Sequence, residues 1–172
     1  MTRGDRIRAA LDAASSHYAA NPGDARSRDS LATASLRDGL VVHVQGANGE
    51  RVATDMVESV GGTGTAPSPG WLLRAAEASC VATLIAMRAA TLGITLDTLE
   101  VAVDSESDDR GMLGMDDSVP AGPLTGRVQV RLTADGVDPA TLDEMARWGV
   151  EHCPVCNALE RPVPITVEVA TN

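Results

Sequence analysis

A long apolar segment between two helix boundary signals is the feature that most constrains how this chain can fold. No residue between positions 78 and 87 is charged. Ser68-Pro69 precedes the segment with an N-cap residue and a proline suited to a first helical position, and Gly93 follows as a typical helix end. Because a helix that is apolar all round is buried, the sequence predicts a central helix over residues 69–92 that contains Cys80.

Segments of alternating apolar and polar residues predict antiparallel strands on both sides of this helix. Before it, Arg37-Asp38-Gly39 and the hairpin signal Asn48-Gly49 join three strands into a meander. After it, two strands, a second helix and a last strand are expected, at residues 99–103, 126–132, 138–150 and 165–169. Hairpins, a long helix, two strands, a helix and a strand suit an α+β fold and not a parallel doubly wound sheet.

Three further segments complete the expected organisation. Residues 4–20 have the spacing of an amphipathic helix, and a polar linker follows, so we divide the chain into an N-terminal helical extension over 1–29 and a main domain over 30–172. Gly61 to Thr65 is expected to be a flexible loop. The acidic, glycine-rich residues 104–123 are expected to form a solvated loop.

The charge and composition exclude several classes of partner. The chain has 172 residues and a net charge of −10, and nucleic-acid binders need a basic face. No apolar signal segment opens the sequence, and no run reaches roughly 18 apolar residues, so we expect a cytoplasmic protein that binds neither nucleic acid nor a membrane. There is no Phe, and a core of small side chains favours the extended packing that dimerisation provides.

The three cysteines are the residues with the clearest chemical potential. Cys80 is either a small core residue or a nucleophile. Cys153-Pro154-Val155-Cys156 has the spacing of a redox pair, which makes a disulfide oxidoreductase one hypothesis. That pair, however, follows a helix near the end of the sequence and not an early strand. No second Cys or His pair has zinc-finger spacing, so no metal is expected.

Four motifs in order resemble the OsmC/Ohr superfamily of osmotically inducible and organic hydroperoxide resistance proteins. Each motif alone is weak, but their order and spacing are fairly specific. The resemblance covers roughly residues 30–170. The motifs are Gly61-Gly62 through Ser68-Pro69, Leu72 to Cys80, Gly93 to Val101, and Cys153 to Cys156.

The resemblance implies a fold and an activity. Members are intertwined homodimers in which curved antiparallel sheets enclose long central helices, and they reduce organic hydroperoxides with no cofactor beyond an external dithiol reductant. Cys80 matches the peroxidatic cysteine and Cys153 the resolving cysteine. Arg37 is the best match for the arginine that stabilises the thiolate. The alternative is that Arg37 is a solvated residue of a turn with no role in the site.

The sequence departs from the family pattern at two places. Gly70 and Trp71 stand where active members have a glutamate at the start of the long helix, which favours an alternative protein that binds a small apolar ligand at the dimer interface. Glu77 either substitutes for that glutamate or raises the Cys80 pKa by repulsion. Cys156 stands where the family usually has Ser, as a further resolving thiol or as a partner of Cys153.

Overall fold

The central helix is present in the computed structural model, which describes residues 1–171. Helix α2 spans Pro69–Leu92, as predicted. The Ser68 hydroxyl accepts a hydrogen bond from the Trp71 amide at 3.2 Å, and Gly93 ends the helix in the left-handed conformation, with φ 74°. Both boundary signals in the sequence therefore act as expected.

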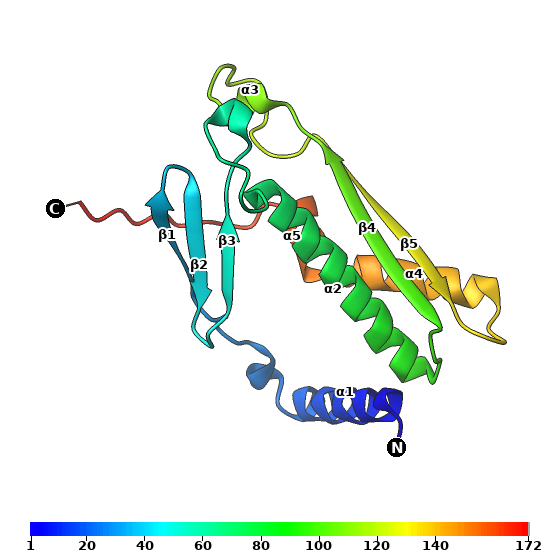
Figure 1. The fold of residues 1–172 in the computed structure, drawn as a ribbon. Helices are drawn as coiled ribbons and strands as arrows, with labels where there is room; N and C mark the ends of the chain where they lie inside the picture. Colours follow the sequence, from blue (N-terminus) through cyan, green and yellow to red (C-terminus); the bar gives the residue numbers. More distant parts are fainter. Residues whose placement is uncertain (172) are drawn as a thin grey trace.

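The strands form two separate antiparallel sheets (Figure 1). The first sheet is a meander in the order β1-β2-β3, whose β2–β3 turn contains Gly49 at φ 91°. The second sheet pairs β4 with β5, with Val101 opposite Val130. Together with the long helix these sheets confirm the predicted α+β fold. The strands are β1 Ala32–Asp38, β2 Val41–Gly46, β3 Arg51–Thr54, β4 Thr98–Glu106 and β5 Thr125–Thr133.

The core lies where α2 packs against α4 and the β4–β5 sheet (Figure 1). Val81, Ile85 and Met145 are almost completely buried there. Gly149 allows the close approach of α4 to α2, because a Cβ atom at this position would overlap the Ile85 side chain. The remaining elements are α1 Arg3–Ala20, a 3-10 turn Pro22–Ala25, a second 3-10 turn Glu58–Val60, α3 Asp109–Met112, α4 Pro139–Glu151 and α5 Pro154–Glu160.

The expected last strand is not formed, and this prediction was wrong for the chain by itself. Residues 165–169 are extended but belong to no strand. Alternating apolar residues favour a strand only where a neighbouring strand completes the ladder of hydrogen bonds, and within residues 1–171 no strand pairs with this segment. The side chains of Ile165, Val167 and Val169 are consequently about four-fifths exposed, at 83%, 78% and 79%.

The loop after β3 is held in one conformation, where the sequence indicated flexibility. The buried carboxylate of Asp55 accepts hydrogen bonds from the hydroxyls of Thr63, at 2.6 Å, and Thr65, at 3.1 Å. It also accepts from the amides of both threonines and of Met56. These bonds, led by the Thr63 hydroxyl, hold the pKa of Asp55 far below its ordinary value despite burial. The same loop places Gly62 so close to Met56 that a side chain would collide with its carbonyl group.

Helix α2 is also long and apolar enough, by length and composition alone, to cross a membrane. This was not predicted from the sequence, which has no uninterrupted run of roughly 18 apolar residues. In the structure α2 packs against α1, α4 and β4, and the core helix of a soluble protein meets the same criterion. Only Val81, Ile85, Ala89 and Ala90 of this helix are buried, so residues 1–171 of a single chain do not give the all-round burial that the sequence predicted.

Candidate functional site

The three cysteines lie together where α2 meets α5. Cys153 and Cys156 belong to the buried core, and Cys80 packs against it from α2. All three are free thiols. Cys153 is fully buried, Cys156 is 5% exposed and Cys80 is half-buried. The fold therefore brings together cysteines that are more than 70 residues apart in sequence.

Cys153 is positioned by the junction between α4 and α5. Pro154 cannot donate a backbone hydrogen bond, and it starts α5 at the first helical position with Cys153 as the N-cap residue. The Cys153 sulfur takes the place of a capping oxygen and accepts the amide hydrogen bond of Cys156 at 3.3 Å. This bond fixes the sulfur beside the first turn of α5.

The thiols of Cys80 and Cys153 lie close enough to affect each other's ionisation, and their pKa values move in opposite directions. Burial, together with the neighbouring Cys153, raises the pKa of Cys80. Burial also acts to raise the pKa of Cys153, but the hydrogen bond from the Cys156 amide and the neighbouring Cys156 and Cys80 thiols outweigh it and lower that pKa. In a single chain these opposite directions favour ionisation of Cys153 over that of Cys80.

The Glu77 carboxylate lies beside the Cys156 thiol. The Cys156 thiol donates to Glu77 Oε1 at 3.6 Å. Burial, the adjacent Cys153 and the charge of Glu77 together raise the pKa of Cys156 strongly. Glu77 is not among the groups that shift the pKa of Cys80, so the repulsion expected from the sequence acts on Cys156 instead. No signal in the sequence relates Glu77 to a residue 79 positions away.

A cleft opens beside this pair, between α2, the β4–β5 sheet and α5. Its volume is about 440 Å³, and Cys156 and Glu77 both line it, whereas Cys80 and Cys153 do not. Leu73 and Leu159 contribute apolar walls, and Arg74 reaches across to donate to the Ser105 hydroxyl at 3.2 Å. The cleft gives a small molecule or a flexible peptide an approach to one sulfur of the cluster.

Arg37 does not approach Cys80 within one chain. It lies on β1, at the bulge where the register with β2 shifts between Leu36 and Asp38, and β1 is the outer strand of its sheet, away from α2 (Figure 1). Arg37 is exposed, and among residues 1–171 it makes no side-chain hydrogen bond or ion pair. Arg88, which lies on α2, has its guanidinium carbon 5.1 Å from the centre of the Trp148 ring. No arginine in the described chain contributes to the pKa of Cys80.

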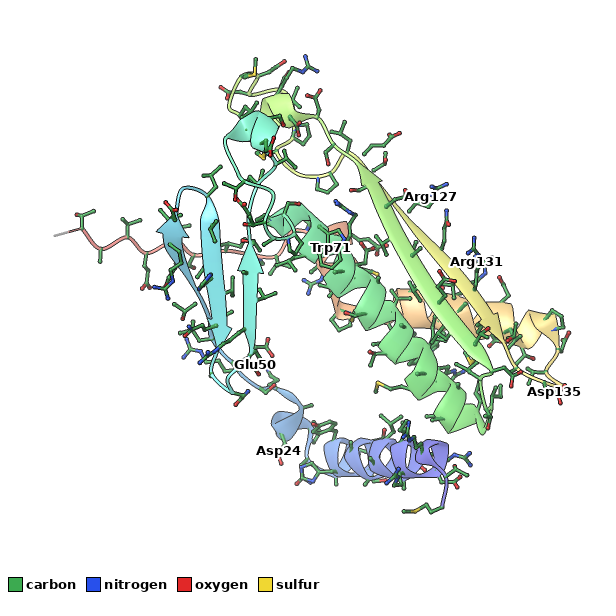
Figure 2. The ribbon with its side chains drawn as sticks, in the orientation of Figure 1. Asp24, Glu50, Trp71, Arg127, Arg131 and Asp135 are labelled. Atoms are coloured by element: carbon green, nitrogen blue, oxygen red, sulfur yellow. The ribbon has the colours of Figure 1, made fainter. Side chains whose placement is uncertain are left out.

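The first turn of α2 carries no acidic residue. Gly70 and Trp71 occupy the positions where a glutamate was anticipated from the family pattern, and Figure 2 shows Trp71 at the N-terminal end of this helix. The Trp71 side chain is 51% exposed. Residues 1–171 contain no group of three or more His, Cys, Asp or Glu side chains arranged to hold a metal ion.

The fold and the sequence together define the class of protein. The family model of OsmC-like proteins matches residues 62–168, more than half of the sequence, so the chain belongs to the OsmC-like family. A search of curated proteins gives no match.

Solved structures of OsmC-like proteins share this fold at low sequence identity. An OsmC-like protein from Mycoplasma pneumoniae has a TM-score of 0.66 and 15% identity, over 78% of this chain and 89% of that one. An organic hydroperoxide resistance protein from Legionella pneumophila has a TM-score of 0.57 and 21% identity, over 78% and 90%. The protein OhrB of Bacillus subtilis, also an organic hydroperoxide resistance protein, has a TM-score of 0.52 and 20% identity, over 78% and 93%.

Proposed function

We propose that this protein is a thiol-dependent peroxidase that reduces organic hydroperoxides, with Cys80 as the nucleophile and Cys153 as the resolving thiol. The observation that carries the proposal is the packing of Cys80, on α2, against the buried cluster that contains Cys153, within an OsmC-like fold. Two of the similar structures are named organic hydroperoxide resistance proteins. Redox-sensitive cysteines are accessible and often lie next to a resolving cysteine, and the half-buried Cys80 has Cys153 as such a neighbour.

The proposed reaction uses only thiol chemistry. The Cys80 thiolate attacks one oxygen of the hydroperoxide, the O–O bond breaks, and the departing alkoxide takes a proton to leave as an alcohol. Cys80 is then a sulfenic acid. The Cys153 thiolate attacks its sulfur, which forms a disulfide and releases water. An external dithiol reduces the disulfide, so no cofactor is needed.

Ionisation of Cys80 requires a cation that the single chain does not place beside it. We assign this role to Arg37 of a second copy in an intertwined homodimer. Three apolar regions support an interface: the β1–β3 sheet with Leu36 at 69% exposure, the extended residues 165–169, and Trp71. Monomeric soluble proteins rarely expose apolar surface on this scale. An apolar site at the interface would favour organic hydroperoxides over hydrogen peroxide.

We also propose that the protein works in the cytoplasm, where thiols are kept reduced. The division of the chain into residues 1–29 and 30–172 remains part of this proposal. Helix α1 then serves as an extension that covers the end of α2.

One observation favours a second candidate function. Because the first turn of α2 has no carboxylate, nothing at this end of the helix orients an arginine, and the exposed Trp71 offers an apolar surface instead. The alternative is an OsmC-like protein that binds a small apolar ligand at the dimer interface without efficient peroxide reduction. It predicts that the unmodified protein does not turn over hydroperoxide and that a carboxylate at position 70 or 71 is needed for activity.

The test titrates the fully reduced protein with an alkyl hydroperoxide and counts the remaining thiols. Cys80→Ser is compared with Ser79→Ala, its neighbour on the exposed face of α2. We expect rapid thiol loss in the wild type and in Ser79→Ala, and none above background in Cys80→Ser. Thiol loss at the same rate in all three proteins would exclude Cys80 as the nucleophile. Slow loss in the wild type that a Gly70→Glu change accelerates would favour the ligand-binding alternative.

A further inference from the structure

We propose that Cys156 is a second resolving thiol, which attacks the Cys80–Cys153 disulfide at the Cys153 sulfur, moves the disulfide to Cys153–Cys156 and releases Cys80. This inference rests on the proposed function and deepens it. It assigns separate sulfurs to the two halves of the cycle, because Cys80 meets the hydroperoxide and Cys156 meets the dithiol reductant.

The arrangement of the three sulfurs supports the exchange. The Cys153 sulfur accepts a hydrogen bond from the Cys156 amide at 3.3 Å, and Cys80 packs from α2 against the buried cluster that contains both residues. Cys153 is the N-cap of α5 and Cys156 lies three residues later, so their side chains are neighbours on the first helical turn. Two cysteines three residues apart at the start of a helix are close enough to form a disulfide. Cys153 can therefore bond to either partner without moving between elements of the fold.

The three sulfurs differ in their surroundings, and only one of them lines the cleft. Cys153 is fully buried, so a reductant cannot attack it directly. Cys156 lines the cleft of about 440 Å³ between α2, the β4–β5 sheet and α5, and neither other cysteine does. Cys80 is half-buried and Cys156 is 5% exposed, so the exchange does not expose a disulfide that was hidden before. It places one sulfur of the disulfide at the wall of this cleft and frees Cys80 to meet a second hydroperoxide.

The surroundings of Cys156 set the order of events. In the reduced protein, burial, the neighbouring Cys153 and Glu77 keep Cys156 protonated by raising its pKa. Once Cys153 is part of a disulfide it can carry no negative charge, so its contribution to the raised pKa of Cys156 is gone. Burial and Glu77 continue to raise the pKa of Cys156, but by less in total than in the reduced protein, so Cys156 is a better nucleophile after the first disulfide has formed.

The exchange balances in atoms, electrons and protons. Cys156 gives up its proton, for which the Glu77 carboxylate at 3.6 Å is the adjacent acceptor. The Cys156–Cys153 bond forms as the Cys153–Cys80 bond breaks, and Cys80 leaves as a thiolate. One disulfide replaces another, so no external oxidant or reductant takes part. In the final step an external dithiol is oxidised to its own disulfide and returns Cys153 and Cys156 to thiols.

The experiment maps the disulfide by alkylation and mass spectrometry after two oxidations of the reduced protein, in the absence of any dithiol. One arm uses one equivalent of an alkyl hydroperoxide, and the other uses one equivalent of diamide, which forms disulfides without peroxidase chemistry. In the hydroperoxide arm we expect Cys80–Cys153 at early times and Cys153–Cys156 at equilibrium, with Cys80 free to alkylate. The diamide arm is expected to reach the same final pair.

Cys156→Ser provides a matched variant. It keeps a hydrogen-bond donor for Glu77, and its oxidised form should remain Cys80–Cys153. A second equivalent of hydroperoxide should then produce a dimedone-reactive sulfenic acid on Cys80 in the wild type but not in Cys156→Ser. The wild-type disulfide map decides the question even where the variant folds poorly.

The two proposals fail in different ways. A Cys80–Cys153 disulfide that persists in both arms of the wild type, with Cys156 still open to alkylation, would overturn the role of Cys156. Failure of hydroperoxide to oxidise any cysteine, while diamide yields Cys153–Cys156, would overturn the peroxidase function and with it the cycle proposed for Cys156, although it would show that Cys153 and Cys156 can pair.

Discussion

The Arg8 side chain donates from Nε to the carbonyl oxygen of Ala90 at 2.9 Å, and so joins α1 to the last turn of α2. The last carbonyls of a helix lack partners within the helix, and a cation there interacts favourably with the helix dipole. Arg8 is half-buried, and it also lies close to Gly93. The N-terminal extension therefore caps the central helix that carries Cys80.

We expect Arg8→Ala to lower the free energy of unfolding by about 1 kcal/mol, through loss of the charged hydrogen bond and of its interaction with the helix dipole. Arg6→Ala is the control, because Arg6 is an exposed residue of the same helix. Urea unfolding followed by circular dichroism measures both. Equal stabilities for the two variants would show that the Arg8 contact contributes nothing.

The packing of α4 on α2 depends on the missing side chain of Gly149. A Cβ at this position would overlap Ile85 in the core, so Gly149→Ala should destabilise the protein by about 1–3 kcal/mol, the usual cost of overpacking. Gly70→Ala is the matched change within α2. No atom lies closer than 3.9 Å to its added Cβ, and the gain in helix propensity should leave stability unchanged or higher. Thermal unfolding of both variants tests the difference in sign.

The buried Asp55 carboxylate should contribute stability that depends on pH. Its pKa is lowered in the folded protein, mainly by the Thr63 hydroxyl. A depressed folded pKa stabilises the protein above the unfolded pKa, near 3.9, and this contribution is lost as the pH falls further. Asp55→Asn should therefore be less stable than the wild type at pH 7, and the gap should narrow below about pH 4.

Asp135→Asn serves as the control, because Asp135 is exposed in the loop after β5. Denaturant unfolding at several pH values from 3 to 7 compares the three proteins. A difference between Asp55→Asn and the wild type that stays constant over this range would contradict the role given to the carboxylate.

The sequence predicts the ends of helices and hairpins well, because the residues at each end determine where it lies. Ser68-Pro69 and Gly93 bound α2, and Asn48-Gly49 closes the hairpin, as their chemistry requires. The predicted strand at 165–169 is absent for a different reason. Alternating apolar and polar residues show which side of a strand would be buried, but they do not show whether a partner strand is available. The contact between Glu77 and Cys156 depends on the packing of α5 on α2. No spacing rule connects two residues so far apart.

The three cysteines should ionise in the order Cys153, Cys80, Cys156. Hydrogen bonds lower the pKa of Cys153 against the effect of burial, whereas burial raises the pKa of the other two. Replacing Glu77 with Gln should lower the pKa of Cys156, because the variant lacks the negative charge that opposes ionisation.

Carbon NMR of Cβ-labelled cysteine follows each thiol through its titration. Glu160→Gln removes a charge from the same cleft without touching the Cys156 thiol, so it should leave the Cys156 titration unchanged. A Cys156 titration that is the same in Glu77→Gln as in the wild type would show that the 3.6 Å contact does not act electrostatically.

Arg37 provides the sharpest test of an active site shared between two chains. If Arg37 of one copy stabilises the Cys80 thiolate of the other, Arg37→Ala should raise the Cys80 pKa and slow hydroperoxide reduction at neutral pH, and Arg37→Lys should recover part of the rate because it restores the charge. Arg51→Ala, an exposed change on β3 of the same sheet, is the control.

Co-refolding Arg37→Ala chains with Cys80→Ser chains then separates action within a chain from action between chains. Under this proposal Cys80→Ser is inactive by itself, and Arg37→Ala by itself is slow. In the mixed dimer, however, the intact Cys80 of one chain faces the intact Arg37 of the other. Activity that rises on mixing above that of either parent supports a site built from both chains. Mixed dimers no more active than the parents would place Arg37 outside the partner's site, because every Cys80 that remains would then depend on an arginine in its own chain.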